Sequence, residues 1–289
     1  MKTLEIPKKS GGTRKIYVQG PKEKYNYRYK GYQLAEFYEK HGTNSAHGFR
    51  QGKSPVSNAA QHLNKKYSLT IDLKDFFDTI TPKHLIDAGV SLDLANGVCY
   101  EGSTKQGLSS SPSAANCAAI PLDKKIHAYI SSHNSIYPDK IVYTRYADDL
   151  TFSCDRVESL IWLRDKIVPE AVKDCGFEIN KKKTRVQSSG FGRRIITGVA
   201  VDDKINPRRK QKRILRAAAH NMKKLQKLLS FLVFTNQLMG FVLVLESNRK
   251  NISKFIGLRE WCKLKEPTKS LDGKLFQTAV KVRTAQAFA

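Results

Sequence analysis

Three aspartates have the residue type and placement to do chemistry together. Asp148 and Asp149 are adjacent in IVYTRYADDLTFS, residues 141–153, between two strand-forming runs, which predicts a β-hairpin with both acids at its tip. Asp72 ends another predicted strand in YSLTIDLKDFF, residues 67–77. Adjacent carboxylates repel and raise one another's pKa, so a cation is needed to offset the repulsion. Paired Mg²⁺ ions, about 3.5–4 Å apart, are held by such carboxylates in phosphoryl-transfer sites.

The residues alone leave two alternatives open. Asp is common in hairpin turns, so Asp148 and Asp149 could be ordinary turn residues. Asp75 and Asp78 follow Asp72 so closely that spacing does not decide which of these acids would join the pair.

The charge of the chain is large and unevenly placed. The 289 residues carry a formal net charge of +25, and residues 181–289 hold 26 Lys and Arg against 6 Asp and Glu. Such an excess favours a polyanionic partner, because a neutral partner would leave the self-repulsion uncompensated. Nucleic acid is the favoured partner; an anionic membrane, a ribosome or a merely soluble basic surface are the alternatives.

Composition also bears on location. The five cysteines form no C-x-x-C pair, which predicts reduced thiols and a cytoplasmic protein rather than a zinc site or a disulfide framework. The N-terminus is too polar for a signal peptide. Residues 228–245 are apolar enough for a membrane span but contain Thr235, Asn236 and Gln237 in the middle, so two buried helices are expected there and no membrane partner.

The elements that must position the aspartates are of mixed type. A hairpin around Gly11 and Gly12, a helix that begins after Ser54 as N-cap, and a helical region after Pro207 are expected. The other expected elements are a helix over 30–42, one long helix over 111–132, a helix over 157–176 and a strand pair over 193–207. The fold class expected is therefore α+β, with a basic helical module at the C-terminal end.

Several motifs, taken in order, resemble those of a known family. DLKDFF, QGLSSSPSAAN, the YADD of VYTRYADDLTFS, and GFEINKKKTRV resemble motifs A to D of reverse transcriptases. AHGFRQGKS followed by NAAQH, and ITG at residues 196–198, resemble elements of bacterial retron reverse transcriptases. The resemblance covers about residues 5–250. It implies a right-hand polymerase with fingers at 1–66, palm at 67–206 (part of 82–105 belonging to the fingers) and thumb at 207–289.

The resemblance also assigns the metal site. Asp72 and Asp148 would be shared ligands of two Mg²⁺ ions, with Mn²⁺ as an alternative and the Leu73 backbone carbonyl as a further ligand. Asp149 would complete the catalytic set, as a supporting residue more than as a bridge between the ions.

Four further residues are implied to contact the incoming dNTP. Arg14 would clamp the triphosphate, and Gln106 would approach the nucleotide and template. Phe77 would be a steric gate against the ribose 2′-OH, and Lys183 would protonate pyrophosphate, with Lys182 as its rival. The alternatives are a solvated charge for Arg14 and a plain core aromatic for Phe77.

A last group is implied to contact nucleic acid. His62 could equally be a structural histidine with satisfied hydrogen bonds. The residues of this group are Asn58, His62, Tyr146, Thr197, Gly198, Arg208, Arg209 and Arg213.

The function implied is that of a retron RNA-directed DNA polymerase. It would copy a dedicated structured RNA from an internal 2′-OH, give a branched RNA–DNA product, and serve antiphage defence with a separate effector protein. Another bacterial reverse transcriptase, of the diversity-generating or intron type, is one alternative, although no attached maturase or endonuclease module is expected here. A catalytically idle RNA-binding scaffold is the other.

Overall fold

The computed structural model divides the chain into two compact units, Met1–Asn206 and Pro207–Ala289. It describes residues 1–7, 11–208, 213–214, 216–217 and 220–221. The first unit is therefore described almost completely. Most of the predicted helical module after Pro207, and all of the apolar run at 228–245, lie outside the described residues.

A four-stranded antiparallel sheet forms the centre of the first unit. Its strand order is β4 (Val142–Tyr146), β5 (Asp149–Cys154), β3 (Tyr67–Asp72) and β6 (Arg185–Ser188). Leu69 pairs with Phe152 and Ile71 with Leu150, and all four side chains are fully buried. Successive residues of a strand point to opposite faces, so this apolar set covers one face only. The other face carries the intervening polar residues, including Asp72 and Asp149.

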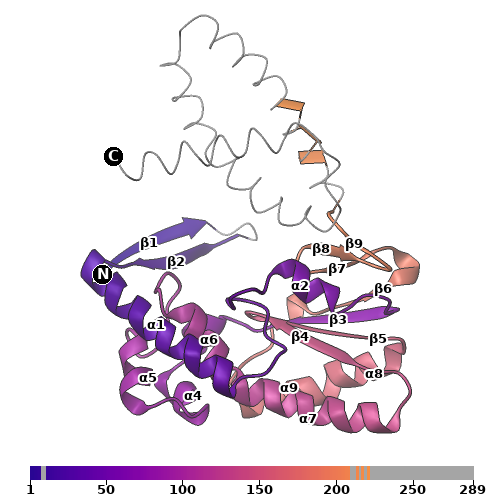
Figure 1. The fold of residues 1–289 in the computed structure, drawn as a ribbon, viewed down its shortest axis with the longest axis horizontal. Helices are drawn as coiled ribbons and strands as arrows, with labels where there is room; N and C mark the ends of the chain where they lie inside the picture. The colour runs from indigo at the N-terminus through magenta and orange to yellow at the C-terminus, as the bar shows by residue number, and fades with distance from the viewer. Residues whose placement is uncertain (8–10, 209–212, 215, 218–219, 222–289) are drawn as a thin grey trace, which may run out of the picture. The chain divides into compact units, whose positions relative to one another are not determined.

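Helices cover the apolar face of this sheet (Figure 1). They are α7 (Ile120–Ile136), α8 (Val157–Trp162), a π-helical segment (Leu163–Ile167) and α9 (Val168–Asp174). The last three continue one another and match the helix expected over 157–176. The widened π turn ends two residues before Pro169, which has no N–H to give to the preceding turn.

The long helix expected over 111–132 is two helices, which corrects that prediction. α6 spans Ser111–Ala118 and α7 starts at Ile120, with Ala119 between them at ψ −1°. Pro121 is the reason, since it has no N–H to donate to the carbonyl of residue 117 and its ring crowds that carbonyl. Proline is well placed in a first helical turn, where the N–H would have no partner, and so the chain begins a new helix there.

A second group of helices packs beside a hairpin. α1 (Pro21–His41) lies against α6 and α5 (Leu92–Val98), with α4 (Pro82–Asp87) next to them (Figure 1). The predicted hairpin around Gly11 and Gly12 is confirmed as β1 (Lys2–Pro7) and β2 (Thr13–Val18). Gly42 caps α1 as expected, because its amide donates to the Tyr38 carbonyl.

A small sheet and a short helix lie on the polar side of the central sheet. β7 (Arg194–Ile196), β8 (Val199–Val201) and β9 (Ile205–Asn206) form three antiparallel strands, one more than the pair expected. α2 (Pro55–Ala60) packs against β8 and β4. Ser54 is its N-cap as predicted, since its side chain accepts a hydrogen bond from the Ser57 amide.

Cysteine and membrane expectations are tested only in part. The four cysteines that the structure describes, Cys99, Cys117, Cys154 and Cys175, are free thiols. Among the helices of the described ranges, none combines the length and apolarity that a bilayer crossing requires.

Candidate active site

The three predicted catalytic aspartates meet at one end of the central sheet. Asp72 is the last residue of β3 and pairs in register with Asp149, the first residue of β5. Asp149 also pairs with Tyr146, so only Ala147 and Asp148 form the turn between β4 and β5. Directly opposed residues of antiparallel strands have Cβ atoms about 4.5–5.5 Å apart. The antiparallel register therefore brings together acids that are far apart in sequence.

The turn holds Asp148 beside the strand end. Ala147 adopts φ +56°, a left-handed conformation that a non-glycine residue seldom takes. The Leu73 amide donates to the Asp148 carbonyl at 3.0 Å. Because N–H and C=O of an extended residue point to the same side of its strand, the Leu73 carbonyl also faces the turn. Its orientation suits the predicted role as a ligand next to Asp148.

The electrostatics of these carboxylates follow from burial and from like charge. Burial raises the pKa of Asp148; the charge of Asp72 raises it further, and Lys183 and Arg14 oppose the increase. Burial, then the charges of Asp148 and Asp72, raise the pKa of Asp149 to about 6. Both raised pKa values mean that the charged carboxylates are disfavoured here. A cation bound between them would stabilise the charged forms.

Lys183 forms an ion pair with one of these aspartates. It lies in a short 3₁₀ turn (Lys181–Lys183), and its Nζ donates to Asp72 Oδ1 at 2.7 Å. This hydrogen bond raises the pKa of Lys183. Lys182, the rival in the sequence, is exposed and has no such bond among the contacts described. Of the two lysines, the geometry favours Lys183.

The residues present are suited to hold divalent cations. In the described part of the chain, no three His, Cys, Asp or Glu side chains form a ready-made metal cluster. Mg²⁺ at polymerase sites is usually held by one or two carboxylates together with phosphate oxygens and water, so such a closed cluster is not required. Two carboxylates with raised pKa, a third at the adjoining strand end and a carbonyl on the same side supply the oxygen ligands that this ion prefers.

Residues predicted to contact the nucleotide lie around the hairpin and α3 (Phe76–Thr79). Phe77 is half-buried in α3; its ring centroid is 6.1 Å from that of Phe49, and its carbonyl accepts from the Thr104 hydroxyl. The Gln106 carbonyl accepts from the Tyr17 amide of β2 at 2.8 Å.

Gly107 permits this close approach of the hairpin. It has φ +105°, and a Cβ there would lie 2.3 Å from the Tyr17 carbonyl oxygen. Arg14 is an exposed residue of the same strand, near enough for its charge to lower the pKa of Asp148.

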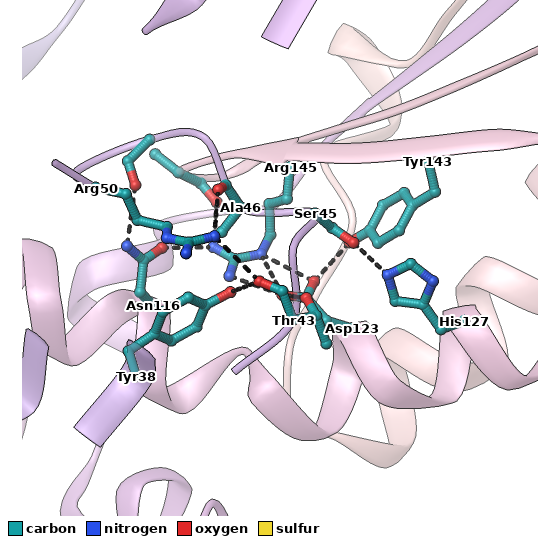
Figure 2. Close-up of polar contacts among 12 residues, drawn as sticks. Tyr38, Thr43, Ser45, Ala46, Arg50, Asn116, Asp123, His127, Tyr143 and Arg145 are labelled. Carbon is teal, nitrogen blue, oxygen red and sulfur yellow. Dashed lines mark hydrogen bonds and ion pairs between the residues drawn. The ribbon is translucent and has the colours of Figure 1, made fainter. Parts of the chain in front are cut away.

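A buried polar network lies next to the β4–β5 turn, and Figure 2 shows its members around Arg145 and Asp123. Arg145 and Asp123 are both fully buried, and Nη2 of the arginine lies 2.8 Å from Oδ2 of the aspartate. Arg145 also donates to Asn116 Oδ1 at 3.1 Å and to the Ala147 carbonyl at 3.2 Å. The Tyr143 hydroxyl donates to Asp123 Oδ1 at 2.7 Å. An arginine one residue before Tyr146 thereby fixes the peptide that carries the turn.

The same network ties a distant loop to the turn. His47 N–H donates to the Arg145 carbonyl and Arg145 N–H to the Ser45 carbonyl, both at 2.8 Å, which places this loop beside β4. Asn116 Nδ2 donates to the Gly48 carbonyl at 2.9 Å. A Cβ on Gly48 would lie 2.6 Å from the Ala147 nitrogen, so only glycine fits there.

The sequence interpretation missed these network residues, although one signal was present. Arg145 shares a strand face with Tyr143, whereas Thr144 and Tyr146 point the other way. A charge on the apolar face of a strand requires a buried partner, and the alternation alone indicates that such an acid exists. It does not identify Asp123.

Asn58 and His62 are not placed for direct contact with RNA, which corrects that prediction. Both are fully buried. The His62 ring nitrogens are each 2.7 Å from a hydroxyl, those of Ser153 and Thr144. Burial lowers the pKa of His62 to about 3, so the ring is neutral. Asn58 donates to Thr197 Oγ1 at 3.4 Å. The structural alternative is the one that the geometry supports.

The other predicted nucleic-acid residues are more open. Tyr146 is half-buried on the polar face of the sheet. Thr197 (φ +45°) and Gly198 (φ +83°) form the turn between β7 and β8. Arg208 and Arg213 belong to the second unit and are exposed, and Arg209 lies outside the described residues.

Comparisons with known proteins show which family and which relatives the chain resembles. The family described as "Reverse transcriptase (RNA-dependent DNA polymerase)" matches residues 6–214. Retron Mx65 reverse transcriptase of Myxococcus xanthus is 32% identical over 248 residues, covering 75% of this chain and 55% of that protein. Retron Ec86 reverse transcriptase of Escherichia coli is 31% identical over 186 residues, covering 61% of this chain and 55% of that protein. The chain thus spans about half the length of these relatives.

The fold has relatives among solved structures. An apo telomerase of Candida tropicalis, truncated from its C-terminal domain, superposes with a TM-score of 0.54 at 14% identity, covering 72% of this chain and 54% of that one. At this identity the likeness concerns the fold alone.

Proposed function

The chain belongs to the reverse transcriptase (RNA-dependent DNA polymerase) family, and from that premise we propose that it is the RNA-directed DNA polymerase of a bacterial retron. The similarity to two retron reverse transcriptases at 31–32% identity supports the retron type. The central sheet with its helices would be the palm, and the hairpin with α1, α4 and α5 would belong to the fingers. The thumb would follow Asn206, where the second unit begins.

The single observation that carries the proposal is the register of β3 and β5. It sets Asp72 opposite Asp149 and places Asp148 in the adjoining turn. Asp72, Asp148 and the Leu73 carbonyl would hold the divalent ions, with Asp149 in support. When bound, two Mg²⁺ ions supply charge neutralisation at the α-phosphate and a lowered pKa of the attacking hydroxyl.

The protein groups around the carboxylates would position the reaction. The hydroxyl of the primer loses its proton, its oxygen forms a bond to the α-phosphorus of the dNTP, and the bond to pyrophosphate breaks. Lys183, whose Nζ donates to Asp72 at 2.7 Å, would give a proton to the departing pyrophosphate. Arg14 on β2 would hold the triphosphate, since a guanidinium suits bidentate phosphate contacts.

Selection of deoxynucleotides would depend on Phe77. Its ring lies beside those of Phe49 and Phe76, and its backbone is held in α3, where its carbonyl accepts from the Thr104 hydroxyl. An aromatic ring at this position would collide with a ribose 2′-OH, so DNA would be the product.

The partners proposed follow from the retron type. They are a dedicated structured RNA primed at an internal 2′-OH, the branched DNA product, dNTPs and a separate effector protein in antiphage defence, all in the cytoplasm. Tyr146 and the Thr197–Gly198 turn would contact the primer strand, and Arg208, Arg209 and Arg213 the duplex backbone.

Primer extension tests the proposal. The purified chain should extend a DNA primer on an RNA template with dNTPs and Mg²⁺, and Asp148→Asn should abolish extension while RNA binding persists. A wild-type chain that binds RNA but never extends would instead be the catalytically idle scaffold. Nucleic acid that co-purifies with the chain should contain a 2′,5′ branch; unbranched cDNA would indicate another type of bacterial reverse transcriptase.

A further inference from the structure

The outer face of α1 carries three exposed tyrosines. Tyr25, Tyr29 and Tyr32 are 72%, 59% and 61% exposed. They follow one another at i, i+4 and i+7, so they share one side of the helix. The opposite side is buried through Leu34 and Tyr38. A helix face turned to solvent usually carries charged residues, and nothing in the packing of the helix requires rings there.

Cations surround this row of rings. Lys22, Lys24 and Arg28 are exposed on the same half of the helix. Arg28 Nε donates to the Tyr32 hydroxyl at 3.0 Å, and its guanidinium carbon lies 5.8 Å from the centre of that ring. The one acid of this stretch, Glu23, accepts from the Gly20 amide at 2.9 Å and lies 3.5 Å from the amino group of the N-terminus. The surface is therefore both aromatic and basic.

We propose that this face, the α1 tyrosine row, binds an unpaired segment of RNA. Proteins bind single strands by stacking bases on aromatic rings while cations contact the phosphates, and this face offers both. The backbone positions that carry the rings are about 6 and 4.5 Å apart along the helix axis, from the rise of about 1.5 Å per residue, so neighbouring bases can each meet one ring. A protein partner would fit less well, because the row is narrow and the polar Asn26 and Gln33 lie beside it on the helix surface.

The α1 tyrosine row is a site in addition to the catalytic one. The buried side of α1 faces α6, because a Cβ on Gly31 would lie 3.2 Å from the Ser109 carbonyl and from Ser110 Cα at the start of that helix. The row points away from this contact, so a strand bound there is distinct from the template and primer at Asp72 and Asp148. The choice of RNA as the strand rests on the proposed function, in which a large structured RNA must be held beyond its templating part.

Binding of a defined probe tests the proposal. Fluorescence anisotropy would measure the Kd of a fluorescein-labelled single-stranded RNA of about 16 nucleotides for the full chain freed of nucleic acid. Replacing all three rings, Tyr25→Ala with Tyr29→Ala and Tyr32→Ala, should weaken binding at least about tenfold, since each stacked ring contributes strongly. The corresponding triple Tyr→Phe variant should bind within about twofold of wild type, because it keeps the rings. Tyr137→Ala, at a tyrosine that is 46% exposed elsewhere, is the matched control.

A second pair of measurements separates the contributions. Lys22→Gln with Lys24→Gln should reduce the slope of log Kd against log salt by about 0.7 per lost phosphate contact, whereas the triple alanine variant should keep the slope. Ultraviolet cross-links to the probe should fall on the peptide that contains Tyr25 and Tyr29. Extension of a short annealed template and primer should be unchanged in the triple alanine variant, because the α1 tyrosine row is proposed as a site separate from the catalytic one.

The outcomes that would overturn the proposal are distinct. Unchanged affinity of the triple alanine variant, or cross-links confined to other peptides, would exclude RNA from this face. If affinity is unchanged but wild-type self-association in sedimentation is lost, the occupant is a second copy of the chain and the proposal is wrong. If wild type shows no extension at all while the alanine variant still loses affinity, the proposed function fails and the α1 tyrosine row stands.

Discussion

Lys183 Nζ lies 2.7 Å from Asp72 Oδ1, an ion pair between residues 111 positions apart in the chain. The lysine side chain is 59% exposed and that of the aspartate only 9%. The ammonium therefore bonds to a buried carboxylate, while most of the lysine side chain is exposed to solvent. A divalent ion and this ammonium would compete for the same oxygen, which links metal binding to the release of a proton donor.

Lys183→Ala should therefore have two opposite effects. Loss of the competing cation should lower the Mg²⁺ concentration needed for half-maximal extension. Loss of the proposed general acid should lower the single-turnover rate by about 10²–10⁴-fold. Single-turnover extension over a series of Mg²⁺ concentrations measures both. Lys182→Ala, at the exposed neighbour, is the control and should change neither. Equal effects of the two substitutions would mean that the lysines act only as a phosphate-binding surface.

Phe77→Ala should relax discrimination against ribonucleotides. Removing a bulky group from a shape-selective pocket typically changes discrimination by about 10–200-fold, here in favour of rNTP incorporation. The ratio of kcat/KM for a dNTP and its matching rNTP is the measurement. Phe49→Ala removes the ring that contacts Phe77 and leaves the gate in place, so its ratio should move much less. A ratio that does not change in Phe77→Ala would leave this residue as an ordinary packing aromatic.

Asp123→Leu and Arg145→Leu should each destabilise the protein strongly. Their side chains are fully buried and 2.8 Å apart, and removal of one partner leaves an uncompensated buried charge that costs about 3–5 kcal/mol. The double variant should lose less free energy of unfolding than the sum of the two single losses, because it leaves no unpaired buried charge. Urea unfolding measures the three free energies of unfolding. Strictly additive losses would show that the pair does not act as a unit.

The same network shows what the sequence could and could not predict. Strand-forming runs around Asp72 and around the Asp148–Asp149 pair were enough to predict a hairpin and a strand end with acids, since these are local patterns. The register that sets Asp72 opposite Asp149 agrees with the expected convergence, although only motif resemblance chose Asp72 over its acidic neighbours. Asp123 was not predicted, because a partner across the core depends on packing between distant elements.

Burial explains the one clear error in the predicted site. Asn58 and His62 are four residues apart, a spacing that on a helix fits an exposed face as well as a buried one. In the structure α2 ends at Ala60 and His62 lies in the turn that follows. Tertiary packing of α2 on β4 and β8 places them inside. The single helix predicted over 111–132 is wrong for a local reason. Pro121 lies within that range, and it ends one helix and begins the next.

His62 should make the fold sensitive to acid. Its pKa falls from an ordinary 6.5 to about 3 because burial, then the charges of Arg194 and His47, disfavour the protonated ring. Between pH 6.5 and 3 the unfolded chain binds a proton that the folded chain does not, so this contribution to stability is present above pH 6.5 and is lost as the pH falls. At pH 5 the loss is about 2 kcal/mol.

Comparison with His62→Gln measures this contribution. The variant should be less stable than wild type at about pH 7.5, because it loses one of the two hydroxyl contacts, and the difference should shrink toward pH 5. Urea unfolding at both pH values gives the four free energies. His47, whose pKa is lowered to about 4 chiefly by burial, is present in both proteins and cancels from the difference. A difference that is the same at both pH values would mean that His62 titrates normally in the fold.

Gly107→Ala should separate the β1–β2 hairpin from the loop that carries Gln106. The added Cβ would lie 2.3 Å from the Tyr17 carbonyl oxygen, which is backbone and cannot rotate away, so β2 must move. Arg14 would move with it, and the KM for dNTP in primer extension should rise by about tenfold or more, the loss of one charge-assisted contact. Gly102→Ala is the matched control, because Gly102 also has a positive φ, +78°, but no atom within 4 Å of the new Cβ. In both variants an alanine with positive φ lowers the stability by about 1–2 kcal/mol. Only in Gly107→Ala does the new Cβ also collide with the Tyr17 carbonyl. A KM that rises equally in both would place the effect in backbone strain and remove the hairpin from nucleotide binding.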